Sequence, residues 1–164
     1  MAALNDDLAN INDVADYIIV KATEAGVHLN LLKLQKLLYY SEAWRLAFTG
    51  QPLTGERFQA WVHGPVNRPT YDRFKDQKVL YSEVTPSDVA QSFRFENLTE
   101  EQRDHIDSVL EAYGQFSGTE LEIMTHREEP WIKARGDRSP SERCDELISS
   151  NLMRDYYKAR LPKA

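Results

Sequence analysis

The chain has 164 residues, of which 41% are hydrophobic and 28% are charged, and its formal net charge is −6. This length predicts one domain over residues 1–164, and the apolar fraction together with 17 aromatic residues excludes a disordered chain. No apolar run approaches the roughly 20 residues of a membrane span, and residues 1–10 lack the layout of a secretory signal. We therefore expect a cytoplasmic protein without a membrane partner, whose single cysteine, Cys144, forms no internal disulfide.

The charge is unevenly distributed along the chain. Residues 96–130 contain 2 basic and 10 acidic side chains, a balance of −8, whereas residues 131–164 contain 8 basic and 5 acidic ones, a balance of +3. In the second stretch basic and acidic residues alternate, which weakens the field that a phosphate backbone requires. A nucleic-acid partner is therefore not expected, and the acidic stretch indicates recognition of a basic one.

Two helices are predicted in the first 50 residues. Apolar side chains at positions 11, 14, 15, 18, 19 and 22 form one helical stripe, with Asn10 or Asn12 as the cap and Gly26 as the stop. A second helix is expected from Asn30 to near Gly50. Its apolar surface is too wide for burial on one side, which predicts the central helix of the core.

Residues 51–98 have a different pattern, because prolines and glycines interrupt any long helix. Alternating residues predict a short strand at 58–62, and the runs 79–81 and 93–95 are candidates to pair with it in a small antiparallel sheet. A short helix is expected over residues 68–75, with Pro69 early in it.

Helical signals return after residue 98. A capping box at Thr99 predicts a helix that ends at Ser117 and Gly118, and a second box at Thr119 predicts a short helix towards His126. Further helical segments are expected from Glu129, from a third box at residues 139–142, and over residues 150–160. The predicted fold is mainly α (α+β): a compact helical domain with a small antiparallel β element in the middle of the chain.

The sequence contains no established catalytic pattern. It has neither a glycine-rich phosphate loop nor an HExxH zinc motif. An enzyme using His63, His126 and Glu128, with or without a metal, is the alternative that the residue types leave open, and Cys144 with His126 or His63 is a weaker one. We expect no enzyme activity, no cofactor and no bound metal, and interpret Cys144 as a packed thiol.

Three segments together resemble a known family. They are LLKLQKLLYYSEAW at residues 31–44, FQAWVHGPV at 58–66 and THREEPWIKAR at 125–135. In this order and spacing they are similar to the Panacea antitoxin domain, found in phage-associated proteins and in SocA-like antitoxins. The resemblance covers about residues 11–157.

The resemblance implies a binding protein that neutralises a toxin encoded beside it. It further implies that SocA-like members act as proteolytic adaptors, which hold the toxin and present it to the ClpXP protease; direct masking of the toxin is the alternative. The resemblance implies no catalytic residue. The candidate partner-binding or motif residues are Trp61, His63, Gly64, Pro65, His126 and Trp131. We expect the acidic stretch to attract a basic toxin and the basic C-terminal helix to face the protease.

Overall fold

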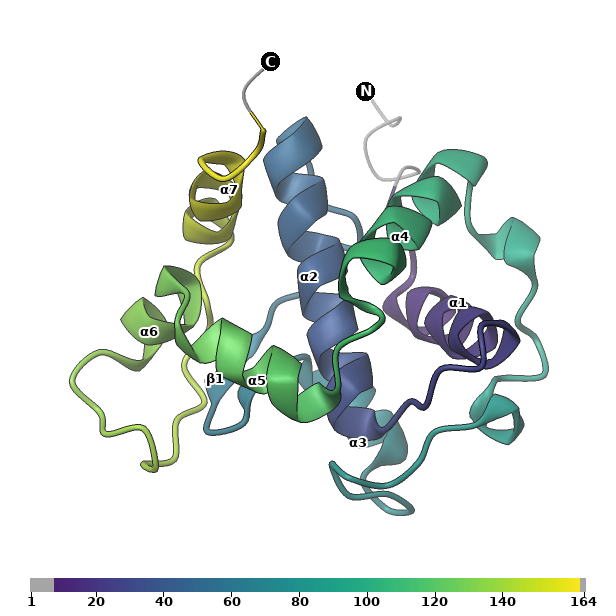
Figure 1. Ribbon diagram of the computed structural model, residues 1–164, viewed down its shortest axis with the longest axis horizontal. Helices are drawn as coiled ribbons and strands as arrows, with labels where there is room; N and C mark the ends of the chain where they lie inside the picture. The colour runs from purple at the N-terminus through teal and green to yellow at the C-terminus, as the bar shows by residue number, and fades with distance from the viewer. Residues whose placement is uncertain (1–7, 163–164) are drawn as a thin grey trace.

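The computed structural model of the chain describes residues 8–162 and is built around one helix, α2 (Leu31–Thr49). Figure 1 shows α2 in the centre, with α7 on one side, α1 and α4 on the other, and α5 crossing its lower part. Of its 19 residues, 15 are buried, which confirms the expected central helix. The other elements are α1 (Ile11–Glu24), β1 (Gln59–Trp61), β2 (Gly64–Val66), α3 (Arg68–Phe74), the 3-10 turns η2 (Pro86–Asp88) and η3 (Phe95–Asn97), α4 (Glu100–Tyr113), α5 (Gly118–His126), α6 (Glu129–Arg135) and α7 (Ser150–Lys158).

The ends of α1 and α2 follow from local chemistry. The Asn10 side chain accepts a hydrogen bond from the Asn12 backbone nitrogen at 2.8 Å, and the Asn30 side chain accepts one from the Lys33 nitrogen at the same distance. Both bonds satisfy amide groups that a helix leaves free at its start. Gly50 ends α2 with φ of +74°, a left-handed conformation that glycine adopts without a steric penalty.

Polar side chains of α2 are buried and bind the backbone of distant segments. Because an unpaired buried polar group is destabilising, each of these contacts holds a loop against the core. The contacts are Lys33 Nζ to Gly114 O (2.6 Å), Asn67 N to Gln35 Oε1 (2.8 Å), Lys36 Nζ to Pro65 O (3.0 Å), and Leu53 N and Thr54 N to the Glu42 carboxylate (2.9 Å each).

The small β element is an antiparallel hairpin of β1 and β2, in which Trp61 pairs with Gly64. The expected strand at 58–62 is therefore confirmed, but the partners expected at 79–81 and 93–95 are wrong. The carbonyl groups of Leu80 and Ser82 instead accept hydrogen bonds from the first amides of α2, so this loop caps a helix. In the second segment, Phe95 packs edge-on against Tyr17 of α1, with 5.5 Å between ring centroids.

Of the three capping boxes predicted after residue 98, the first is present and the other two are not at the predicted positions. The box at Thr99 is present, but α4 ends at Tyr113, and Ser117 caps α5 instead of ending α4. Ser117 forms the reciprocal pair with Glu120, so the cap predicted at Thr119 is two residues too late. Residues 139–142 form a turn instead of the expected helix, and the carbonyl groups of Ser139, Pro140 and Glu142 accept hydrogen bonds from Arg135. No helix within the described range is long and apolar enough to cross a membrane.

Candidate partner-binding site

The second and third motifs meet at one corner of the molecule. The hairpin supplies Trp61, His63, Gly64 and Pro65, whereas α5 supplies His126 and α6 supplies Trp131. The indole Nε1 of Trp131 donates to the backbone oxygen of Trp61 at 2.8 Å, and the His126 ring stacks on Trp131 with 4.0 Å between centroids. The structure thus brings all six candidate residues into one cluster, which we call the motif corner.

Gly64 allows the hairpin to approach the first motif. Its φ is +95°, and a Cβ atom at this position would overlap Lys36 Cε and lie 2.9 Å from Thr125 Oγ1. Both the backbone conformation and the space therefore require glycine. This close approach lets Lys36 Nζ reach the backbone oxygen of Pro65 at 3.0 Å.

Lys36 is fully buried beneath this turn. Burial disfavours the charged ammonium group and lowers its pKa to about 7, although the negative charge of Glu122 opposes the shift. Glu122 is also the hydrogen-bond acceptor of His63 Nδ1 at 3.1 Å. The motif corner therefore combines a buried amine, a carboxylate and an imidazole near the surface.

Arg135, the last residue of the third motif, connects Trp131 to the backbone of two neighbouring segments. Its guanidinium group lies 4.8 Å from the Trp131 ring centroid and donates to the backbone oxygens of Ala60 and Ser139, each at 2.8 Å. Trp131 itself is only 5% exposed, and burial lowers the pKa of His126. Trp131, Gly64 and Pro65 are therefore core residues at the motif corner.

Of the six candidate residues, Trp61, His63 and His126 are partly exposed. The His63 side chain is 43% exposed, and the Trp61 ring is half-buried against Tyr71 at 4.8 Å between centroids. Beside them is a hollow of about 400 Å³, whose wall also includes Arg68, Lys75 and Cys144. An external partner at this corner would meet Trp61 and His63 first.

Each residue of the enzyme alternative already has a partner within the fold. Glu128 Oε1 accepts hydrogen bonds from the Tyr40 and Tyr157 hydroxyl groups at 2.8 and 2.7 Å, so this carboxylate links two tyrosines of the core. His63 is bonded to Glu122, whereas His126 stacks on Trp131. Across residues 8–162, no three histidine, cysteine or acidic side chains are placed to hold a metal ion.

The carboxylate of Glu128 and its tyrosines form a network that the sequence analysis missed. Tyr40 stacks on Tyr113 with 4.1 Å between centroids, and the Tyr39 hydroxyl lies 3.2 Å from that of Tyr157. Burial raises the pKa of Glu128 and raises that of Tyr113 to about 12. The adjacent tyrosines of the first motif were the available signal, because buried hydroxyl groups need partners.

Comparisons with known proteins identify the family of the chain. The family described as "Antitoxin SocA-like, Panacea domain" matches residues 34–132, more than half of the chain. The chain belongs to this family. It is also 29% identical over 126 residues to Antitoxin SocA of Caulobacter vibrioides (strain NA1000 / CB15N). That alignment covers 72% of this chain and 66% of the relative, slightly less than two thirds of its length. No solved structure matches the chain.

The Panacea match runs from α2 to the middle of α6 and therefore includes the whole motif corner. Within it, the polar side chains of α2 bind loop backbones, and Trp131 binds the hairpin. These motif residues therefore hold the fold together, and Trp61, His63 and His126 are the partly exposed members of the cluster.

Proposed function

We propose that this Panacea-domain chain binds and neutralises a toxin protein encoded beside it, and that it works as a proteolytic adaptor. In this mechanism the chain holds the toxin and presents it to the ClpXP protease. The observation that carries the proposal is the family match over residues 34–132, which includes the residues that join the hairpin to α6. The relative's printed name describes it as an antitoxin, which supports the same function here.

An adaptor needs separate surfaces for its two partners. At the motif corner, we propose Trp61 and His63 as partner contacts, with Gly64, Pro65, His126 and Trp131 holding them in position. For the protease, we propose the exposed basic side of α7, which includes Lys158. If the variant Lys158→Glu delivers the toxin as fast as the wild type, this placement of the protease is wrong.

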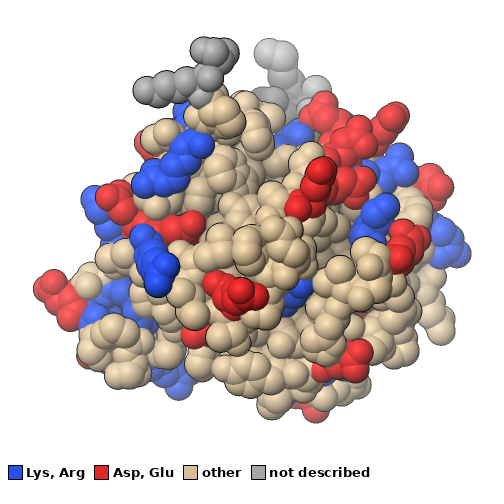
Figure 2. Space-filling view, in the orientation of Figure 1, with Lys and Arg blue, Asp and Glu red and all other residues tan. Residues whose placement is uncertain are grey.

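The acidic residues of α4 support an electrostatic role in toxin binding. Figure 2 shows acidic side chains gathered over α4, at the upper right of this face. Clustered charge of one sign raises the association rate of an oppositely charged partner and has its largest effect at low salt. We therefore propose that the toxin carries a basic segment. Binding that does not change with salt concentration would contradict this step.

The adaptor mechanism is tested by the lifetime of the toxin in cells. The protein encoded by the neighbouring open reading frame should be degraded quickly when this chain and ClpX are both present, and should persist when either is removed. Neutralisation that continues without ClpX would instead support masking of the toxin. The variant His126→Ala tests the enzyme alternative, because a folded His126→Ala protein that still neutralises the toxin would remove a catalytic role for this ring.

A further inference from the structure

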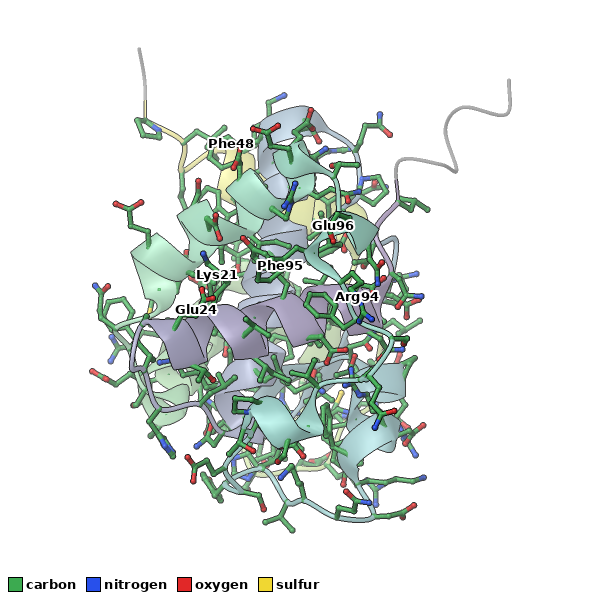
Figure 3. The ribbon with its side chains drawn as sticks, turned by 90° about the vertical axis from the view of Figure 1, so that its right-hand side faces the viewer. Lys21, Glu24, Phe48, Arg94, Phe95 and Glu96 are labelled. Carbon is green, nitrogen blue, oxygen red and sulfur yellow. The ribbon has the colours of Figure 1, made fainter. Side chains whose placement is uncertain are left out.

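A second aromatic surface lies at the other end of α2 from the motif corner. It is a groove of about 220 Å³ between the end of α2, α4 and the residues after α7. Phe48, on its wall, is 60% exposed. An exposed aromatic ring beside an apolar groove is typical of a surface that binds a partner. In Figure 3 the labelled Phe48 lies at the top of the molecule, beside α4. The groove is lined mainly by Trp44, Phe48, His105, Val109, Tyr113 and Leu161.

The walls of this groove are held in place by internal bonds. Trp44 Nε1 donates to the Tyr113 hydroxyl at 2.7 Å, and His105 Nε2 donates to the Ser41 backbone oxygen at 2.8 Å. Burial lowers the pKa of His105, so this wall carries no positive charge at neutral pH. A preformed apolar groove loses little side-chain freedom when a partner binds, which favours affinity.

One edge of the groove is acidic. Asp104 and Glu111 are exposed on α4 and lie four residues before and three residues after the groove residue Ser108, so all three share one side of the helix. Glu101 lies one turn before His105 and forms an ion pair with Arg45. The acidic patch over α4 in Figure 2 thus borders the groove.

The opposite edge differs in charge. Arg160, next to the groove residue Leu161, lies over the Tyr156 ring at 3.4 Å from its centroid. A partner segment would therefore meet carboxylates along α4 and a cation near the chain after α7. This asymmetry favours one orientation of a segment whose basic residues lie along one edge.

We infer that this groove docks an amphipathic segment of the toxin, whose apolar residues contact Phe48 and whose Lys or Arg residues face Asp104 and Glu111. The inference rests on the proposed function and specifies where the toxin binds. The groove lies two to three helical turns from Lys36 along α2, or roughly 12–18 Å. The groove is therefore a second contact surface for the toxin, separate from Trp61 and His63 at the motif corner.

The test measures binding of the purified protein encoded by the neighbouring open reading frame to variants of the full chain. Phe48→Glu should raise Kd at least about 30-fold, as loss of a central aromatic contact does. Val79→Glu is the matched control, because Val79 is 69% exposed and lies outside the groove. It should bind within about twofold of the wild type. Circular dichroism checks that both variants are folded.

The charged edge is tested separately. The double variant Asp104→Lys, Glu111→Lys should lower the association rate about tenfold at low salt, whereas Asp137→Lys, on an exposed loop, should leave it unchanged. Equal binding by Phe48→Glu and Val79→Glu would overturn the inference while leaving the proposed function intact. No binding by the wild type would overturn both. If the wild type is a dimer that Phe48→Glu converts to a monomer with unchanged toxin affinity, a second copy occupies the groove and the inference is wrong.

Discussion

Trp131 donates its indole hydrogen to the backbone oxygen of Trp61 over 2.8 Å, so one hydrogen bond joins the third sequence motif to the second. In the linear sequence these residues are 70 positions apart. The bond fixes the hairpin against α6 and sets the position of the Trp61 ring, whose own Nε1 donates to Gln59 within the same strand at 2.7 Å. The motif corner therefore depends more on Trp131 than on Trp61 for its stability.

The first prediction compares the same change at both positions. Trp131→Phe removes the bond to the hairpin and part of a buried ring, and we expect the free energy of unfolding to fall by about 2 kcal/mol. Trp61→Phe loses a bond within a half-buried strand and should cost less than about 1 kcal/mol. Urea denaturation followed by circular dichroism measures both. Equal losses would contradict a supporting role for Trp131.

The second prediction concerns the tight turn at Gly64. Gly64→Ala introduces a methyl group that overlaps Lys36 in a left-handed backbone conformation, and we expect a loss of about 2–4 kcal/mol in stability. Gly26→Ala is the control, since Gly26 also has positive φ, +69°, but has open space around it. It should cost about 1 kcal/mol, and the difference between the variants measures the steric part.

The third prediction follows from the buried amine of Lys36. Its pKa falls from 10.5 in the unfolded chain to about 7 in the folded one, so between these values the unfolded state binds more protons. The stability contribution is fully present above pH 10.5 and is lost as the pH falls through 7. Stability should therefore rise between pH 7 and 9, with a contribution of up to about 1.4 kcal/mol per pH unit.

The variant Lys36→Met isolates this effect. Its stability should rise less steeply from pH 7 to 9 than that of the wild type, whereas Lys133→Met, which changes an exposed lysine, should keep the wild-type slope. Chemical denaturation at a series of pH values gives the three slopes. Identical slopes for the wild type and Lys36→Met would show that Lys36 keeps its proton in the folded protein throughout this range.

The fourth prediction concerns the carboxylate that the tyrosines share. Glu128→Gln keeps an oxygen that accepts from Tyr40 and Tyr157, and we expect a change within about 1 kcal/mol. Glu128→Ala leaves both hydroxyl groups without this acceptor and should destabilise the protein by about 3 kcal/mol. Thermal unfolding distinguishes the variants. A Glu128→Gln protein as unstable as Glu128→Ala would mean that the negative charge itself is required.

Hydrophobic periodicity and capping residues predicted the helical framework well. The stripe after Asn10 and the span from Asn30 to Gly50 are confirmed, because both helices begin at clear caps and α1 in addition has a single apolar stripe. The prediction that residues 79–81 pair with the strand at 58–62 was wrong, because a short apolar run does not reveal which backbone groups it will hydrogen-bond to. Its neighbours bind the start of α2, which no local pattern indicates.

The contents of the motif corner were predicted, but their arrangement was not. The six candidate residues come from the second and third motifs, and only the fold shows that Trp131 binds the hairpin and that Gly64 lies against Lys36 of the first motif. One signal was available in the sequence: a helix with apolar residues on all sides must also bury its polar ones. The bonds of Lys36 and Glu42 to loop backbones follow from that requirement.

The most direct test of the antitoxin account is a growth experiment with the neighbouring open reading frame. That frame is induced in cells with this chain, without it, and with the folded control Val79→Glu. The account predicts that growth stops without the chain, and that the wild type and Val79→Glu both restore growth and co-purify with the induced protein. If the induced protein stops growth and equal amounts of the wild-type chain neither restore it nor bind that protein, the account is contradicted.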